Sequence, residues 1–180
     1  MNVLLTVGHG TADQHTLLDL FRGVDVSHVV DVRRYPGSRR NPDVSTEALN
    51  EWLPGAGIGY RWEARLGGRR QIPAAQKQDP DPWWQVEAFR AYAAHTRTAQ
   101  FRIALSELLD GLAVAAPRTT LIMCSESLWW RCHRRLISDA AVLLHGTEVQ
   151  HLAHDGRLTP HPPSPGARVT PEGLYYDRVT

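Results

Sequence analysis

The sequence predicts an α/β fold, in which a layered, mostly parallel sheet is flanked by helices in a single domain. Short apolar and β-branched segments alternate with segments whose apolar residues recur at helical spacing, which is typical of strand–helix–strand units. A length of 180 residues suits one domain that buries a sizeable core without disulfides. Ligands of such folds collect beyond the carboxyl ends of the strands, so the loops there are the first candidates for function.

The N-terminal half is predicted to alternate strands and helices in a regular way. "VLLTVGHG" is a short buried strand that enters a glycine loop, and "VSHVVDVR" is a second strand that ends at a loop containing proline and glycine. Between them, apolar residues at helical spacing precede a glycine stop. In chain order the predicted elements are a strand at 3–10, a helix at 12–23, a strand at 26–33, a short capped helix at 45–53 and a strand that starts at 57.

The C-terminal half repeats this alternation. "TTLIMC" is a strongly apolar strand, and an Asp-Gly turn lies within the last strand segment. The predicted elements are helices at 83–96 and 98–113, a strand at 119–124, a helix at 129–146 and a strand with a turn at 147–160. We therefore assign an α/β domain to residues 1–160 and a proline-rich arm on the surface to residues 161–180.

The composition excludes several classes of protein. No apolar run is long enough to span a bilayer, and the N-terminus lacks the pattern of a signal peptide, so we expect a cytoplasmic protein with no membrane partner. Two cysteines cannot form a disulfide framework. The net charge is only +1, but 19 of the 20 basic residues are arginine, whose planar fork suits phosphate. No feature indicates an obligate protein partner.

Both cysteines lie in "LIMCSESLWWRCHRRLIS", at 121–138, where three kinds of chemistry compete. Cys124, Cys132 and His133 are candidate zinc ligands, but their spacing differs from that of a zinc knuckle, and adjacent side chains at a helix start diverge by about 100°. A thiol nucleophile is the second possibility, although free cysteines are usually small buried hydrophobes. We expect no metal, no cofactor and no cysteine nucleophile. The third interpretation, which we favour, is that this segment forms a wall of a ligand site.

Two carboxylates lie where an apolar strand ends or is about to end. Asp31 is inside "VVDVR", and Glu126 follows "TTLIMC" by two residues. A charge in such a position needs a partner or a function. The alternatives are a structural ion pair with an arginine such as Arg33 and a catalytic carboxylate that positions water or stabilises positive charge.

Arginines and aromatic rings alternate in the same loops. Basic residues interleaved with flat rings suit a phosphodiester backbone beside stacked bases. The helix predicted to start near Trp129 offers an anion its free N–H groups, and one Trp of the pair at 129–130 is expected to be exposed. The residues expected to bind substrate on these grounds are Arg33, Arg39, Arg40, Arg69, Arg70, Trp129, Trp130, Arg131 and Arg134.

Several motifs resemble the DUF488 family over residues 4–158. They are "VGHG", "DVRRYPGS", "GIGYRWEARLGGR", "FRAY" and "LIMCSESLWWRCHRRLI", with "VQHLAHDGR" similar to the closing strand and turn of the family. The resemblance implies an α/β domain with one shared site, but not a reaction. The positions it marks are His9, Asp31, Arg33, Pro36, Ser38, Tyr60, Gly67, Gly68, Cys124, Glu126, Cys132, His133 and Arg134.

These positions complete the expected site. His9 joins Asp31 and Glu126 as a catalytic candidate, and Ser38, Tyr60 and His133 join the substrate-binding group. This chain departs from the usual motifs at "GHG" and at "SLWW", where a Trp pair would favour a ligand with a ring.

The combined pattern favours an enzyme that acts on nucleic acid. The best match is a DNA glycosylase-like hydrolase, which cleaves the N-glycosidic bond of a modified base and therefore needs phosphate contacts, flat side chains and a carboxylate. DNA is the expected partner. A hydrolase of nucleotides or phosphate esters and a non-catalytic nucleic-acid-binding module are the alternatives.

Overall fold

The computed structural model describes residues 3–37, 40–72, 80–115 and 119–178, and it confirms the predicted fold class. Six strands form one sheet in the order β3-β2-β4-β1-β5-β6, in which β6 alone pairs antiparallel with its neighbour. The strands are β1 (Val3–Gly8), β2 (Val26–Asp31), β3 (Gly59–Trp62), β4 (Thr119–Cys124), β5 (Glu148–Leu152) and β6 (Leu158–Pro160). Strand β4 lies between β1 and β2 and is therefore central.

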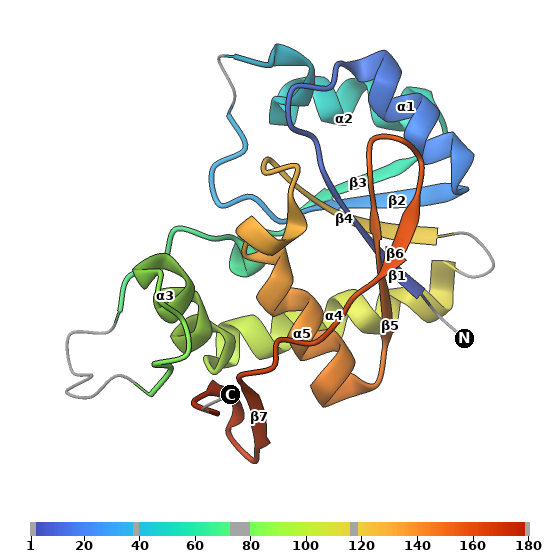
Figure 1. Cartoon of the computed structure of the whole chain (residues 1–180). Helices are drawn as coiled ribbons and strands as arrows, with labels where there is room; N and C mark the ends of the chain where they lie inside the picture. Colours follow the sequence, from blue (N-terminus) through green and yellow to red (C-terminus); the bar gives the residue numbers. More distant parts are fainter. Residues whose placement is uncertain (1–2, 38–39, 73–79, 116–118, 179–180) are drawn as a thin grey trace.

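Helices cover both faces of the sheet (Figure 1). One face carries α1 (Gln14–Gly23) and α2 (Thr46–Gly55), and the other carries α3 (Glu87–Thr96), α4 (Ala99–Ala115) and α5 (Arg134–His145). The helix ends follow local rules: the Asp13 side chain accepts a hydrogen bond from the Thr16 N–H at 2.9 Å, and Gly146 ends α5 with φ +64°. None of the described helices has both the length and the apolar character needed to cross a bilayer.

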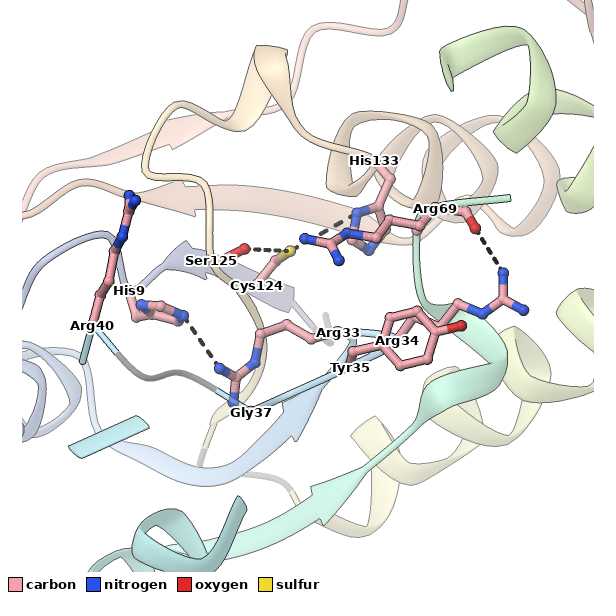
Figure 2. A pocket seen from close by; sticks show the side chains of 11 residues that line it. His9, Arg33, Arg34, Tyr35, Gly37, Arg40, Arg69, Cys124, Ser125 and His133 are labelled. Carbon is pink, nitrogen blue, oxygen red and sulfur yellow. Dashed lines mark hydrogen bonds between the residues drawn. The ribbon is translucent and has the colours of Figure 1, made fainter. Parts of the chain in front are cut away.

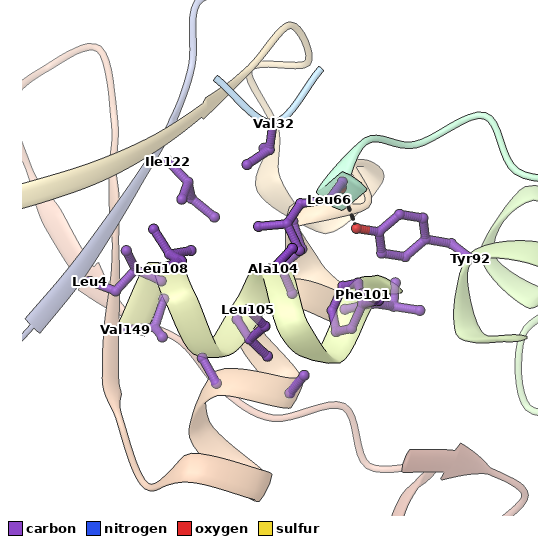
Figure 3. Packing of buried hydrophobic residues seen from close by; sticks show 14 of the residues in the cluster. Leu4, Val32, Leu66, Tyr92, Phe101, Ala104, Leu105, Leu108, Ile122 and Val149 are labelled. Atoms are coloured by element: carbon purple, nitrogen blue, oxygen red, sulfur yellow. Dashed lines mark hydrogen bonds between the residues drawn. The ribbon is translucent and has the colours of Figure 1, made fainter. Parts of the chain in front are cut away.

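The alternation along β4 assigns its side chains to the two cores. Leu121 and Met123 pack with α1 and α2, whereas Ile122 and Cys124 face the core of α3, α4 and α5. All four are buried, as expected for a strand covered on both faces. Figure 3 shows Ile122 above the side chains of α4 in that second core. This register places the Cys124 sulfur on the α5 side, at the carboxyl end of the strand.

The helix predicted at 129–146 begins later than its sequence pattern indicated. Trp129–Arg131 form a 3₁₀ turn, Cys132 is extended with φ −121° and ψ 150°, and α5 starts only at Arg134. The prediction that Arg131 and Arg134 share a helical face is therefore wrong. The helix predicted at 83–96 likewise starts later, at Glu87, and the Trp83 N–H bonds to the Tyr176 carbonyl at 3.0 Å.

The segment expected as a surface arm takes part in the packing of the domain. It contains a hairpin of β7 (Ala167–Thr170) and β8 (Gly173–Tyr176). Leu174 and Tyr176 are buried in the core beside α3 and α5. The Tyr176 hydroxyl donates to Asp139 at 3.0 Å, so a polar anchor accompanies the apolar contact.

Candidate functional site

A cavity of about 450 Å³ opens at the carboxyl ends of β1, β2 and β4 (Figure 2). This is the sheet edge at which the fold class predicted the site. Its lining combines four arginines, two histidines, a thiol, a hydroxyl and a tyrosine ring. The lining residues are His9, Arg33, Arg34, Tyr35, Gly37, Arg40, Gly68, Arg69, Cys124, Ser125 and His133.

Asp31 lies beneath this cavity, in an ion pair with Arg33. The Arg33 Nε donates to Oδ1 at 2.8 Å and a terminal nitrogen donates to Oδ2 at 2.6 Å, while the Tyr60 hydroxyl donates to Oδ2 at 3.0 Å. Asp31 is fully buried and Arg33 is nearly so. Asp31 and Tyr60 are thus brought together with the site but do not line it. Their contacts orient Arg33, as expected for a buried charge with its partner.

His9 is held as a neutral ring at the cavity wall. Arg33 can only donate, so the His9 Nε2, 3.3 Å from that guanidinium, accepts, and Nδ1 carries the proton that is donated to the Gly10 carbonyl at 2.9 Å. Burial, together with the charge of Arg33, lowers the pKa of His9 to about 4. Both ring nitrogens are engaged, so this geometry makes His9 a wall and positioning residue of the cavity.

The rim of the cavity carries arginines that are open to solvent. Arg40 and Arg69 are exposed, and Arg34 is half-buried with one terminal nitrogen donating to the Arg69 carbonyl at 2.6 Å. Arg69 has φ +55°, a left-handed conformation that is uncommon outside glycine. Arg70, in contrast, donates to the carbonyls of three neighbouring residues and so braces its own loop; these are Ala64, Arg65 and Gly67.

A second cavity of about 440 Å³ lies next to the first. The two share Arg34, Tyr35 and Arg69 as lining residues. Arg70 and His95 extend the lining of the second cavity. The shared arginines make one continuous basic surface. Two expected phosphate and substrate ligands, Ser38 and Arg39, lie outside the described residues.

The floor of the first cavity brings together both cysteines and a histidine. The Cys124 and Cys132 sulfurs lie 3.8 Å and 3.7 Å from the His133 Nδ1. The His133 Nε2 lies 3.0 Å from the Val32 carbonyl and therefore carries a proton, which leaves Nδ1 facing the two thiols. Within the described chain, this is the group of histidine, cysteine and carboxylate side chains that could hold a metal.

The two thiols of this cluster are electronically different. A hydrogen bond to Cys132 is the main cause that raises the pKa of Cys124. Burial disfavours ionisation of Cys132, but its contacts with Cys124 and His133 together lower its pKa well below the ordinary range. The pKa values of the two buried thiols are therefore shifted in opposite directions.

The sequence pattern did not indicate that these three side chains converge. It placed Cys132 at a helix start, where His133 would point about 100° away. The extended backbone at Cys132 removes that obstacle, and both side chains reach the same point. The signal available in the sequence was a cysteine at the end of a buried strand followed by a Cys-His pair.

The other expected site residues lie in the loop after β4, away from the cavity lining described for this chain. Glu126 is exposed and accepts from the Leu128 N–H at 3.2 Å. Trp129 stacks on His151 at 4.2 Å, whereas Trp130 is 48% exposed, which confirms that one Trp of the pair is accessible. Arg131 is also exposed.

Arg134 is 1% exposed and therefore cannot contact a ligand in the way its helical position suggested. It donates to Thr6 Oγ1 at 3.2 Å and to the carbonyl of Glu126. A buried guanidinium that binds a strand and the following loop fixes the shape of the cavity wall from behind. Its role is thus in positioning, because burial separates its charge from solvent.

Comparison with known proteins agrees with the resemblance seen in the motifs. The sequence model of a family described as "Domain of unknown function DUF488" matches residues 14–141, which is more than half of the chain. The matched range includes the loops of Arg33, Arg69 and Cys124 and excludes the loop of His9. No curated protein and no solved structure matches the chain. The chain therefore belongs to the DUF488 family.

Proposed function

We propose that the chain is a hydrolase directed at nucleic acid or nucleotides, which holds phosphate oxygens on Arg34, Arg40 and Arg69 at the cavity rim. The observation that carries this proposal is the charge of the lining: among the described residues that line the cavity, every fully ionised side chain is an arginine. Arginine forks match phosphate geometry and remain charged at any physiological pH. The positive surface would also speed the approach of a polyanion.

The dimensions of the site support a substrate larger than a free phosphate. A cavity of about 450 Å³ is in the range that holds small-molecule ligands, and Tyr35 at its edge is 62% exposed. A flat, exposed ring beside arginines can stack on a base. The adjoining cavity continues the basic surface over Arg69 and Arg70, which favours a strand of several nucleotides over a single one.

The bond that is hydrolysed follows from what lies at the cavity floor. The floor presents Cys124, Ser125 and His133, whereas both expected carboxylates are elsewhere: Asp31 is buried beneath Arg33 and Glu126 is on the outer loop. Cleavage of an N-glycosidic bond relies on a carboxylate. The arrangement therefore gives more support to hydrolysis of a phosphate ester, while the glycosylase form stays a prediction.

The direct test is incubation with a panel of substrates. It contains single-stranded and duplex oligonucleotides with assorted modified bases, unmodified oligonucleotides and mononucleotides. Released bases and abasic sites report glycosylase action, and new phosphate ends or inorganic phosphate report ester hydrolysis. We expect the second outcome, in a cytoplasmic protein that acts without an obligate partner. Release of free base with intact phosphates would instead favour the glycosylase.

Binding gives a second, independent readout. Arg40→Ala should weaken oligonucleotide binding and reduce the slope of log affinity against log salt by roughly one unit, because one phosphate contact is lost. Arg22→Ala, which removes an exposed arginine of α1, is the matched control and should leave the slope unchanged. Equal slopes in all three proteins, with no turnover on any substrate, would refute the proposal.

A further inference from the structure

We propose that Cys124, Cys132 and His133 bind one Zn²⁺ ion whose fourth coordination position opens into the basic cavity. The cluster supplies two sulfurs and one imidazole nitrogen, a set of soft and intermediate donors that favours zinc among common cellular metals. Two thiolates would balance the charge of the ion. This departs from the expectation, made from the spacing and from the divergence of adjacent side chains on a helix, that the chain holds no metal.

The spacing of the donor atoms fits a tetrahedral site. With Zn–S of about 2.3 Å and Zn–N of about 2.0 Å, adjacent sulfur and nitrogen ligands of a tetrahedral ion are about 3.5 Å apart. The His133 Nδ1 lies 3.8 Å from the Cys124 sulfur and 3.7 Å from the Cys132 sulfur. All three donor atoms lie within 4.8 Å of one another. The two sulfur–nitrogen distances are thus within a few tenths of an ångström of those that a bound ion requires.

The surroundings of His133 prepare one ring nitrogen for a metal. Its Nε2 donates to the Val32 carbonyl at 3.0 Å, so the lone pair is on Nδ1, which faces the sulfurs. Metal-bound histidines usually donate their other N–H to such a partner, which fixes the tautomer and orients the ring. On the Nδ1 side a Cβ at Gly68 would lie 2.8 Å from this nitrogen, so the glycine keeps that space clear.

The backbone around the cluster is fixed by rigid elements. Cys124 ends the central strand β4, and its carbonyl accepts from the His9 N–H at 2.9 Å. Cys132 and His133 lie between the 3₁₀ turn Trp129–Arg131 and the start of α5, which anchors both residues. Ligands carried by packed elements keep their geometry without metal, so the site is prepared before the ion arrives.

The direction of the open position gives the ion a role. Cys124 and His133 line the cavity while Cys132 is behind them, so the side of the cluster without a protein donor faces the cavity. Three protein ligands and one open position are the arrangement of catalytic zinc, which brings the pKa of a bound water to about 7. This catalytic role rests on the proposed function, whereas zinc binding itself does not.

The test uses the full-length protein, purified under reducing conditions and then freed of metal with a chelator. Zinc added against a chromophoric chelator should bind with a stoichiometry of one, and Co²⁺ should give the intense visible absorption of a tetrahedral site and sulfur-to-metal bands. Cys124→Ser, Cys132→Ser and His133→Gln should each weaken zinc binding more than about 100-fold, beyond the loss typical of outer contacts. His15→Gln, which alters an exposed histidine of α1, should bind zinc normally.

The outcomes separate the two proposals. If the wild-type protein binds neither zinc nor Co²⁺ while both thiols can be titrated with a thiol reagent, the proposed metal site is wrong. This result does not depend on whether any variant folds. Zinc binding without turnover on any substrate would support the site and count against the hydrolase. Full turnover by the metal-free protein, lost in Cys124→Ser, would overturn the catalytic role of the ion and favour a thiol nucleophile.

Discussion

Two polar clusters lie at α5, one in the middle of the helix and one just before its start, and they differ in whether their members reach a cavity. Asp139, on the helix, ends a buried chain in which Thr6 bonds to His151 at 2.7 Å, His151 to His161 at 2.9 Å and His161 to Asp139 at 2.9 Å. With Arg134 donating to Thr6, neutral histidines allow every donor in this chain to point the same way. The chain is closed, and none of its members lines the cavity beneath the basic rim.

The cluster of Cys124, Cys132 and His133, just before α5, differs in lying at a cavity. Its sulfur–nitrogen contacts of 3.8 Å and 3.7 Å are ordinary for hydrogen bonds to sulfur, and two of its members line the cavity. Its three donor atoms lie within 4.8 Å of one another, as the ligands of a single ion would. Burial and polarity alone therefore do not identify a site. The cluster whose donor atoms converge at a cavity is the functional candidate.

The largest expected effect is a loss of stability when the hydrogen-bonded series from Thr6 to Asp139 is broken. Asp139→Ala removes the acceptor for His161, for the Ser164 N–H and for the Tyr176 hydroxyl. It should lower the free energy of unfolding by about 3–5 kcal/mol, because buried donors lose their partner. Urea unfolding followed by Trp fluorescence measures this loss. Oligonucleotide affinity of the folded fraction should not change, and a loss below 1 kcal/mol would show that the chain is not structural.

The same cluster should make the stability of the protein depend on pH, because it contains a buried neutral histidine. Burial, with His161 and the charge of Arg134 nearby, lowers the pKa of His151 to about 3. Between that value and 6.5 the unfolded chain takes up a proton that the native ring does not, so stability is complete above pH 6.5 and falls as the pH falls. His151 should contribute up to about 1.4 kcal/mol per pH unit.

Unfolding free energies measured from pH 7 to pH 4 test this contribution. His151→Gln should show a shallower decrease than the wild type, even if its stability at pH 7 is lower. His15→Gln replaces a histidine on the surface of α1 and should keep the wild-type slope. An identical slope in His151→Gln would mean that this ring is protonated in the native state.

Two substitutions of Arg69 test backbone strain and ligand binding at the cavity rim separately. Its φ of +55° suits glycine, so Arg69→Gly should be more stable than Arg69→Ala by about 1 kcal/mol. Both variants lose the same charge and should weaken oligonucleotide binding to the same extent, roughly 10-fold at low salt. Thermal unfolding and salt-dependent binding measure the two effects. Wild-type affinity in both variants would remove Arg69 from the proposed site.

The smallest effect is expected for Trp130. Its ring is 48% exposed and meets Trp129 edge-on at a centroid distance of 5.6 Å, outside the cavity lining. Trp130→Ala should change stability and oligonucleotide affinity by less than about 0.5 kcal/mol. Fluorescence quenching by single-stranded and duplex DNA measures the affinity. A loss of 1–3 kcal/mol would restore the stacking role that the sequence pattern suggested.

The sequence by itself determined the fold class and the edge of the sheet where the site lies. Apolar periodicity separates strands such as Thr119–Cys124 from helices, because burial on both faces demands a continuous apolar run. The position of polar loops after parallel strands then locates His9, Arg33 and Cys124 at one edge. The sequence also predicted that one Trp of the pair at 129–130 is exposed, and the structure identifies it as Trp130.

Only the tertiary structure decided which of those residues share a site. Asp31 and Arg134 carry charges that look functional in the sequence, but both are buried. Asp31 bonds to the neighbouring Arg33 and to Tyr60 of β3, and Arg134 donates to Thr6 of β1. Cys132 and His133 look divergent until the backbone before α5 is seen to be extended. Local sequence determines periodicity and helix capping. The contact between Cys124 and His133 depends instead on how β4 and the start of α5 pack, which is a property of the whole fold.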